Sequence, residues 1–342
     1  MHRGYFGNLA NLETIGNRGK TWLVSLDSFN MIWLGHIQKS TETAAAARPV
    51  IRKFLSEQKR LVRETLDKRF IYFICSREKI RFRPTRRTRP GLWRGNFTLP
   101  FIAGSAETRH DIPVSPARFP ERNGRPPAAI STERDALILH YPEGPDETIP
   151  VWSVAANFTF PGGTEIHYVG YTQNPEDRFT RSRHAGLADV KQRVDARDKD
   201  IFIHFNLFRV YLVDAEEEAP VTCFLSNAML GEVPTNEEGF IIEEMCILYF
   251  DSAWQNRNKT KEYARLRNRL KRLRTGKNVS SLHLIYNPAD RGNELCFFSS
   301  AVAPAWIHEC RFTLDGDRLI LERDKNVCER SRPAMLQIQD SV

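Results

Sequence analysis

HYVGYTQNPEDR, residues 167–178, predicts the end of a strand, a tight polar turn and the start of a helix. Tyr168 continues an alternating apolar pattern that is typical of a strand. Asn174 suits the N-cap position, and Pro175 follows at the first helical position, where its missing N–H has no consequence. Arg178 would then project from the first turn of the helix toward the end of the strand. A tyrosine and an arginine held together in this way can bind a phosphate.

The composition is that of a folded protein, since 41% of the 342 residues are hydrophobic and 11% are aromatic. This length is enough for two or three domains. No apolar run approaches the length of a membrane span and the first residues lack a signal pattern. We therefore expect no membrane partner and a cytoplasmic location, associated with the nucleoid in a prokaryote. The six cysteines are scattered without a CxxC pair, which predicts reduced thiols and no structural zinc.

The net charge of +8 is concentrated in two segments. Residues 77–94 carry a net charge of +7 and residues 257–277 carry +9, so the rest of the chain is about −8. Two dense basic segments on an otherwise acidic chain favour a polyanionic partner, and we expect a nucleic acid. The alternative interpretation is that both segments are solvated surface faces.

The chain before residue 150 predicts two parts, an N-terminal module at 1–95 and a connection at 96–149. Residues 84–150 contain eleven of the 19 prolines, which favours a loop-rich connection with a small ordered piece at 136–141. The alternation at 79–83 would place cations on one face of a strand. The other elements expected in the module are a hairpin within 21–37 that turns at 27–30, a helix at 41–68 and a buried strand at 70–75.

The chain from residue 150 predicts an α+β core over 150–277. The helix expected at 240–250 is apolar except for Glu243 and Glu244, and a buried acid needs a cation, a metal or hydrogen-bond donors. The helix expected at 259–275 has one apolar stripe and two basic flanks, and Gly276 is its expected end. The remaining expected elements are strands at 151–160, 165–171 and 201–213, a helix from 174 toward 186, a broken acidic insertion at 214–239, a strand-rich region at 278–325 with a hairpin at 310–323, and a tail at 326–342.

An ordered set of residues over about 150–258 resembles the GIY-YIG nuclease superfamily. The second half of the family motif is matched by a Tyr-Val-Gly triplet, and an arginine follows the glycine after eight residues. A helix-borne glutamate and an asparagine twelve residues later complete the set. The matched residues are Tyr168, Val169, Gly170, Arg178, Glu244 and Asn256. The resemblance implies a small mixed or antiparallel sheet flanked by helices, with an added N-terminal α/β module and a C-terminal strand-rich region.

The resemblance also implies a metal-dependent DNA endonuclease of restriction, homing or repair type. Glu244 would bind a single Mg²⁺ or Mn²⁺, with Glu243 as the alternative ligand. Arg178 would stabilise the charge on the phosphate. A tyrosine, or a water that it positions, would take the proton of the nucleophile.

The first half of the motif, Gly-Ile-Tyr, has no counterpart on the strand expected at 151–160. The nearest triplet there places Trp152 where a tyrosine is expected, and tryptophan cannot act as a base. The candidates for that role are therefore Tyr168, Tyr171 and His184.

Flanking cations would bind the nucleic acid, which we expect to be DNA rather than RNA. One alternative is a catalytically inactive nucleic-acid-binding protein on the same scaffold. Another is a chance likeness, in which the basic segments bind RNA or an acidic protein. The cations expected to contact DNA are Arg81, Arg83, Arg86, Arg87, Arg265, Arg269 and Arg272.

Overall fold

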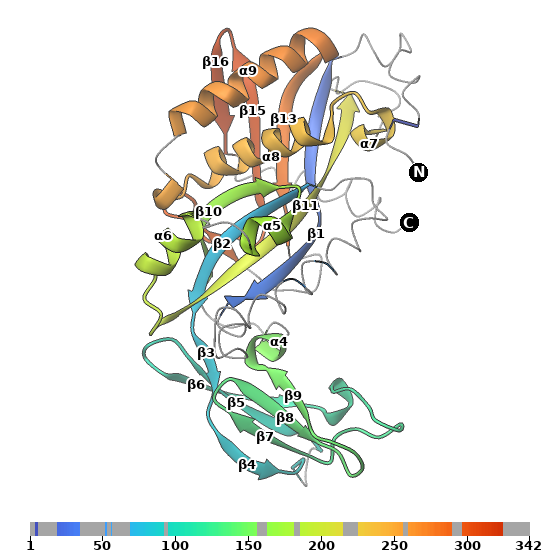
Figure 1. Ribbon diagram of the computed structural model, residues 1–342, viewed down its shortest axis with the longest axis vertical. Coiled ribbons are helices and arrows are strands. Elements are labelled where there is room, and N and C mark those ends of the chain that lie inside the picture. The colour runs from blue at the N-terminus through green and yellow to red at the C-terminus, as the bar shows by residue number, and fades with distance from the viewer. Residues whose placement is uncertain are drawn as a thin grey trace.

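The computed structural model describes residues 4–5, 19–34, 52, 56, 69–91, 95–155, 163–180, 185–214, 225–255, 259–288 and 296–323. Within them the chain is an α+β protein built on one large sheet (Figure 1). Its strands follow the order β14-β10-β2-β11-β1-β13-β15-β16, with β12 beside β11. In that order they are Phe297–Phe298, Thr164–Thr172, Phe70–Glu78, Lys199–Asp214, Lys20–Trp33, Val279–Tyr286, His308–Asp315 and Arg318–Glu322, and β12 is Leu225–Ser226.

Strand β1 is one long strand, so the hairpin predicted within 21–37 is wrong. The polar residues 27–30 do not turn the chain back, because they continue to pair with β11 through a bulge between Leu26 and Ser28. The helix expected at 41–68 lies outside the described residues, apart from positions 52 and 56 in that range. The tail expected at 326–342 also lies outside them.

Strand β2 is buried on both faces, which explains its continuous apolar sequence. Its side chains alternate between two cores. Tyr72 and Ile74 pack on one face with residues of α5 and α6, whereas Phe73 packs on the other face with residues of α8 and α9. The helices are α5 (Pro175–Thr180), α6 (Ala185–Arg193), α8 (Thr235–Phe250) and α9 (Lys259–Lys277).

The helices and strands predicted after residue 160 are largely confirmed. Strands β10 and β11 and helices α8 and α9 occupy the expected ranges. Helix α9 continues past Gly276 and ends before Asn278, which takes a positive φ of 55°. The hairpin of β15 and β16 turns at Gly316, also with a positive φ. The predicted acidic insertion is partly ordered, because α7 (Asn227–Leu230) follows β12.

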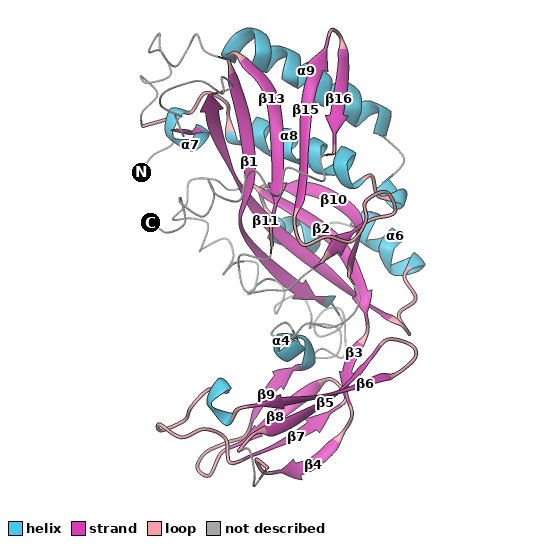
Figure 2. Cartoon of the chain, turned by 180° about the vertical axis from the view of Figure 1, so that it is seen from behind, coloured by secondary structure: helices cyan, strands magenta, loops and turns pink. Residues whose placement is uncertain are grey.

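The predicted loop-rich connection at 96–149 is wrong, because this region belongs to a small β domain. One sheet has the order β3-β5-β6 and the other the order β4-β7-β8-β9 (Figure 2). Most prolines of this region lie at strand ends, in turns or on edge strands, where no ladder N–H is required, whereas Pro100 lies within the central strand β5. The elements are β3 (Ile80–Phe82), β4 (Thr85–Thr88), β5 (Phe97–Ala103), β6 (Thr108–Val114), η2 (Pro116–Arg118), β7 (Ala129–Glu133), β8 (Ala136–His140), β9 (Glu147–Pro150) and α4 (Val151–Ala155).

This β domain has its own core, in which Phe82 and Phe101 pack with ring centroids 4.6 Å apart. The chain leaves the large sheet after β2, forms this domain and returns to the large sheet at β10 (Figure 1). The domain therefore begins before residue 95 and continues past residue 150, where the sequence predicted boundaries. The strand expected at 151–160 is also wrong, since residues 151–155 form α4 and residues 156–160 lie outside the described residues. None of the described helices is long and apolar enough to cross a membrane.

Candidate active site

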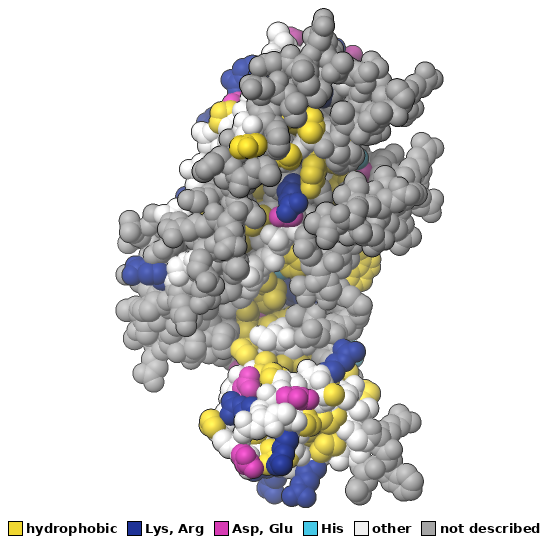
Figure 3. Space-filling model, turned by 90° about the vertical axis from the view of Figure 1, so that its right-hand side faces the viewer, with side chains coloured by type: hydrophobic (Ala, Val, Ile, Leu, Met, Phe, Trp, Pro, Cys, Tyr) yellow, Lys and Arg dark blue, Asp and Glu magenta, His cyan; other side chains and the backbone are white. Residues whose placement is uncertain are grey.

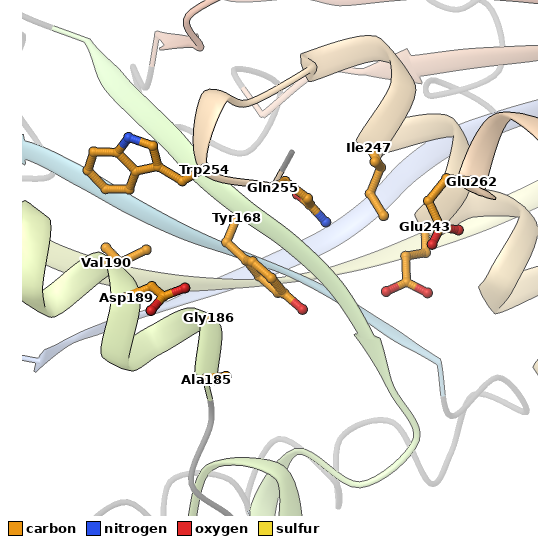
Figure 4. Close-up of a pocket in the computed structure, with 10 residues that line it drawn as sticks. All are labelled: Tyr168, Ala185, Gly186, Asp189, Val190, Glu243, Ile247, Trp254, Gln255 and Glu262. Atoms are coloured by element: carbon orange, nitrogen blue, oxygen red, sulfur yellow. The ribbon is translucent and has the colours of Figure 1, made fainter. Parts of the chain in front are cut away.

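A pocket of about 310 Å³ lies at the edge of β10, between α6 and α8. Figure 4 shows the hydroxyl end of Tyr168 and the carboxylate of Glu243 pointing toward one another across it. Asp189 of α6 and Glu262 of α9 also line the pocket, together with Trp254 from the short helix η3 (Ala253–Gln255).

Two tyrosines from neighbouring strands meet beside this pocket. Strand β10 pairs antiparallel with β2, which places Gly170 opposite Tyr72. The rings of Tyr72 and Tyr168 are stacked, with centroids 6.1 Å apart and planes at 20°. A Cβ atom at position 170 would lie 2.3 Å from the Tyr72 hydroxyl oxygen, so only glycine leaves room for this phenol.

Arg178 joins the two tyrosines from helix α5. The helix begins with Pro175, and the backbone N–H of Arg178 donates to the carbonyl of Asn174. The Nε of Arg178 donates to the hydroxyl oxygen of Tyr72 at 3.2 Å. The convergence of Tyr168 and Arg178 that the sequence predicts is therefore present, with Tyr72 as an additional member.

Burial raises the pKa of both phenols. The pKa of Tyr72 is raised by burial and by the neighbouring Tyr168, and that of Tyr168 by burial and by the charge of Glu243. Both therefore keep their protons near neutral pH and serve as hydrogen-bond donors. Arg178 is the permanent positive charge beside them.

Glu243 occupies the edge of β10, where its Oε1 accepts a hydrogen bond from the backbone N–H of Tyr171 at 2.9 Å. Burial and the nearby charges of Glu262 and Glu244 raise the pKa of Glu243 to about 7, against the effects of the Tyr171 N–H and Arg178. The carboxyl group of Glu243 therefore titrates near neutral pH.

The side-chain amide of Gln255 fixes the same strand edge. Its Oε1 accepts from the N–H of Val169 at 2.8 Å, and its Nε2 donates to the carbonyl of Val169 at 2.6 Å. These two bonds replace a ladder pair on the side of β10 that faces the pocket. Gln255 thus holds the backbone next to Tyr168 in place.

Of the two acids predicted as metal ligands, Glu243 lines the pocket and Glu244 is not among its lining residues. Successive residues of a helix point in different directions. The carboxylate of Glu244 accepts from Nε of Arg269 at 3.1 and 3.2 Å, and Arg269 also pairs with Glu237. Burial raises the pKa of Glu244 to about 7, although Arg269 opposes this shift.

The other described candidate for the general base, Tyr171, lies elsewhere. Tyr171 packs on the opposite face of β10, against Gly239 and the ring of Phe240. Trp152 is buried on α4 and donates to Asp200, so it does not occupy the place of the missing tyrosine. His184 and Asn256 lie outside the described residues.

Tyr72 is the member of this cluster that the sequence analysis does not identify. It ends the triplet Phe70-Ile71-Tyr72, which has the Ile-Tyr half of Gly-Ile-Tyr. That signal was present, but the triplet stands before the β domain rather than on the segment directly before β10. The strand expected directly before β10, at 151–160, lies on the other side of the β domain from Tyr72.

The predicted DNA-contacting cations differ in their environments. The prediction for Arg81 is wrong, because its buried guanidinium bonds both carboxylate oxygens of Asp200, at 2.6 and 2.8 Å. Arg269 is held by Glu244. The pairs at exposed positions are Arg83 with Asp111, Arg265 with Glu262 and Arg272 with Glu237. Arg86 and Arg87 are exposed and form no ion pair with any other described residue.

The donors at the pocket fit a hard divalent cation. Glu243 and Glu262 line the same space, and the charge of Glu262 raises the pKa of Glu243, although Glu262 also pairs with Arg265 at 2.9 Å. No group of three or more His, Cys, Asp or Glu side chains within the described ranges has a metal-binding arrangement. Mg²⁺ commonly needs only one or two protein carboxylates, because it keeps several waters.

Comparisons with known proteins gave no match. Neither the family models, the curated proteins nor the solved structures included one similar to this chain.

Proposed function

We propose that this protein is a metal-dependent endonuclease that hydrolyses DNA phosphodiester bonds through a site of GIY-YIG type. The observation that carries the proposal is the convergence of Tyr72, Tyr168, Arg178 and Glu243 from β2, β10, α5 and α8. The local architecture also supports it, since β10, β2 and β11 form an antiparallel unit with helices on both faces. Such a unit is what the sequence resemblance implies.

In this proposal Arg178 binds a nonbridging phosphate oxygen and stabilises the negative charge that develops on it. The hydroxyl groups of Tyr72 and Tyr168 remain protonated, so they donate hydrogen bonds to the phosphate or orient the attacking water. A water that these hydroxyl groups position would take the proton of the nucleophile. This assignment keeps the second of the two roles that the resemblance implies for a tyrosine, which is to position a water.

Glu243 and Glu262 would hold the divalent cation. When bound, the cation would stabilise the extra charge on phosphorus and on the leaving oxygen. A positive ion would also lower the pKa of Glu243 and keep its carboxylate ionised.

The test is cleavage of supercoiled plasmid and of a branched duplex in the presence of Mg²⁺ or Mn²⁺. Arg178→Ala and Glu243→Gln are expected to lose at least a hundredfold in rate, on the scale of one lost charge-stabilising group. Arg197→Ala and Glu133→Gln remove matched exposed groups outside the pocket and should cleave at the wild-type rate. Equal rates for all five proteins would refute the proposal.

A non-catalytic nucleic-acid-binding protein is the second candidate. The raised pKa of both phenols favours it, because neither tyrosine is then prepared to act as a base. Tight duplex binding without cleavage under every metal tested would support this alternative.

A further inference from the structure

We propose that the edge strand β4 of the inserted domain, with the residue that follows it, is a second DNA-binding element. It contacts the phosphate backbone of a duplex through Arg86 and Arg87 of β4 and the adjoining Arg89, here called the β4 arginines. The inference deepens the proposed function and rests on it for the choice of DNA. The three side chains are exposed. Figure 3 shows lysine and arginine side chains gathered at the lower end of this domain.

The backbone of β4 is built to present these arginines. Thr85 pairs with Thr132 and Thr88 pairs with Ile130, so three residue steps on β4 face two steps on β7. This difference is a bulge, and the extra residue lies in the Arg86-Arg87 pair. A bulge on an edge strand turns side chains away from the sheet and toward a partner.

Two threonines anchor the bulge on either side. The hydroxyls of Thr85 and Thr132 lie 3.0 Å apart, and the hydroxyl of Thr88 donates to the carbonyl of Ile130 at 3.2 Å. The backbone that carries Arg86 and Arg87 is therefore fixed at both ends. An anchored strand loses less conformational entropy on binding than a free loop does.

The charge pattern of the domain sets the β4 arginines apart. Four other arginines of the domain pair with nearby acids, and the exposed Arg109, Arg118 and Arg134 stand far apart in the sequence. The β4 arginines instead lie together within residues 86–89 and form no ion pair among the described residues. Unpaired exposed cations attract a polyanion without first having to break an internal pair. The neutralised pairs are Arg81 with Asp135, Arg83 with Asp111, Arg122 with Glu147 and Arg125 with Glu143.

The composition of the patch favours a duplex over a single strand. Residues 85–89 contain only threonine and arginine, so they offer no aromatic ring on which an unpaired base could stack. Single-strand binding commonly depends on such stacking. Arginines without aromatic neighbours instead fit the backbone phosphates of a duplex.

The patch has a fixed position relative to the candidate active site. Arg81 joins the domain to the large sheet, because it bonds Asp200 of β11 and also pairs with Asp135 of its own domain at 2.6 Å. Trp152 donates to the same carboxylate of Asp200 at 2.8 Å. Tyr72 and Arg86 are separated by a nearly extended chain, whose length sets an upper limit of roughly 50 Å between them. A duplex of roughly 15 base pairs is as long as this limit, at about 3.4 Å for each base pair.

The experiment measures binding of the full chain to a 30-base-pair DNA duplex without divalent metal, across a range of salt concentrations. The variant is Arg86→Ala/Arg87→Ala/Arg89→Ala. Its matched control, Arg118→Ala/Arg125→Ala/Arg134→Ala, removes the same charge from exposed positions of the same domain. We expect the slope of log K against log [salt] to become shallower by about 2 to 3 for the β4 variant, at about 0.9 for each lost phosphate contact. Its affinity near 0.1 M salt should fall at least tenfold, while the control stays close to wild type.

Equal slopes for the two triple variants would overturn the proposal. Equal or tighter binding of a 30-nucleotide single strand would overturn the duplex assignment, and tighter binding of the corresponding RNA duplex would overturn the choice of DNA. Because no metal is present, the outcome is independent of catalysis. A protein that passes this test but never cleaves DNA would refute the proposed nuclease and leave the β4 site standing.

Discussion

Replacing Gly170 by alanine should displace Tyr72 and separate activity from stability. The added Cβ would lie 2.3 Å from the hydroxyl oxygen of Tyr72 and 2.4 Å from its Cζ. The φ angle of Gly170 is not positive, so the backbone itself accepts alanine and the conflict is purely one of space. The Tyr72 ring cannot retreat easily, because it is fully buried against Tyr168 and Phe179.

The size of the effect follows from the overlap. Ordinary contact between these atoms requires roughly 3.5 Å, so the phenol has to move by about 1 Å. This shift disturbs the 3.2 Å hydrogen bond from Arg178 to Tyr72. A displacement of 1 Å within a catalytic arrangement can reduce the rate by about a hundredfold. Overpacking of this kind lowers the free energy of unfolding by about 1–3 kcal/mol.

Gly239→Ala is the matched control. Its Cβ would lie 2.4 Å from the ring of Tyr171, on the opposite face of β10 from the tyrosine pair. The overlap is comparable, but it acts on the ring of Tyr171 rather than on Tyr72 or its hydrogen bond with Arg178. Part of its destabilisation should be offset by the better helix propensity of alanine, by up to about 1 kcal/mol.

The assay combines urea unfolding with DNA cleavage, and the rate is normalised to the folded fraction. We expect Gly170→Ala to lose about a hundredfold in rate per folded molecule and Gly239→Ala to lose less than threefold. If both variants cleave at the same rate per folded molecule, the tyrosine pair does not act in catalysis. If Gly170→Ala is as stable as wild type, Tyr72 does not pass over Gly170.

Three further predictions concern buried charges. The carboxyl of Glu243 has a pKa of about 7 in the folded state and an ordinary value near 4.5 in the unfolded state. The folded state therefore binds this proton more tightly, and the resulting contribution to the free energy of unfolding is complete below pH 4.5 and is lost as the pH rises through 7. In metal-free buffer the free energy of unfolding of the wild type should therefore fall between pH 5 and 8 by up to about 3 kcal/mol more than that of Glu243→Gln. Parallel curves of unfolding free energy against pH for the two proteins would contradict this prediction. Glu238→Gln should lower the free energy of unfolding by about 3–5 kcal/mol, because it leaves the buried Arg69 without its charged partner. Urea titrations measure this change, and a loss below about 1 kcal/mol would contradict the prediction. Asp200→Asn should lower the free energy of unfolding by less, about 1–3 kcal/mol in the same titrations, because Arg81 keeps its ion pair with Asp135. A larger loss for Asp200→Asn than for Glu238→Gln would contradict this reasoning.

Local patterns predicted most of the elements that surround the candidate site. The continuous apolar run at 70–75, the alternation at 165–171 and the N-cap before Pro175 each report a backbone preference within a few residues. The strands and helices they predict are present. The same is true of the stripe that buries Leu266 and Leu270 on α9.

The choice between Glu243 and Glu244 could not be made from the sequence. Both acids interrupt the same apolar helix, and the pattern shows only that both need partners. Which one reaches the pocket depends on which neighbours the helix meets. Arg269 from α9 takes Glu244, and the free edge of β10 takes Glu243.

The paired tyrosines were hidden because the β domain occupies the place of a hairpin turn. Ser76 at the end of β2 pairs with Glu165 at the start of β10, so the two ends of the inserted domain are neighbours in space. The entropy of closing a loop grows only with the logarithm of its length, and a folded insertion supplies its own core. The hairpin that brings Tyr72 to Gly170 therefore tolerates a whole domain at its turn. A motif defined by short spacing along the sequence does not connect Tyr72 with Gly170, whereas the pairing of β2 with β10 places the two residues opposite each other.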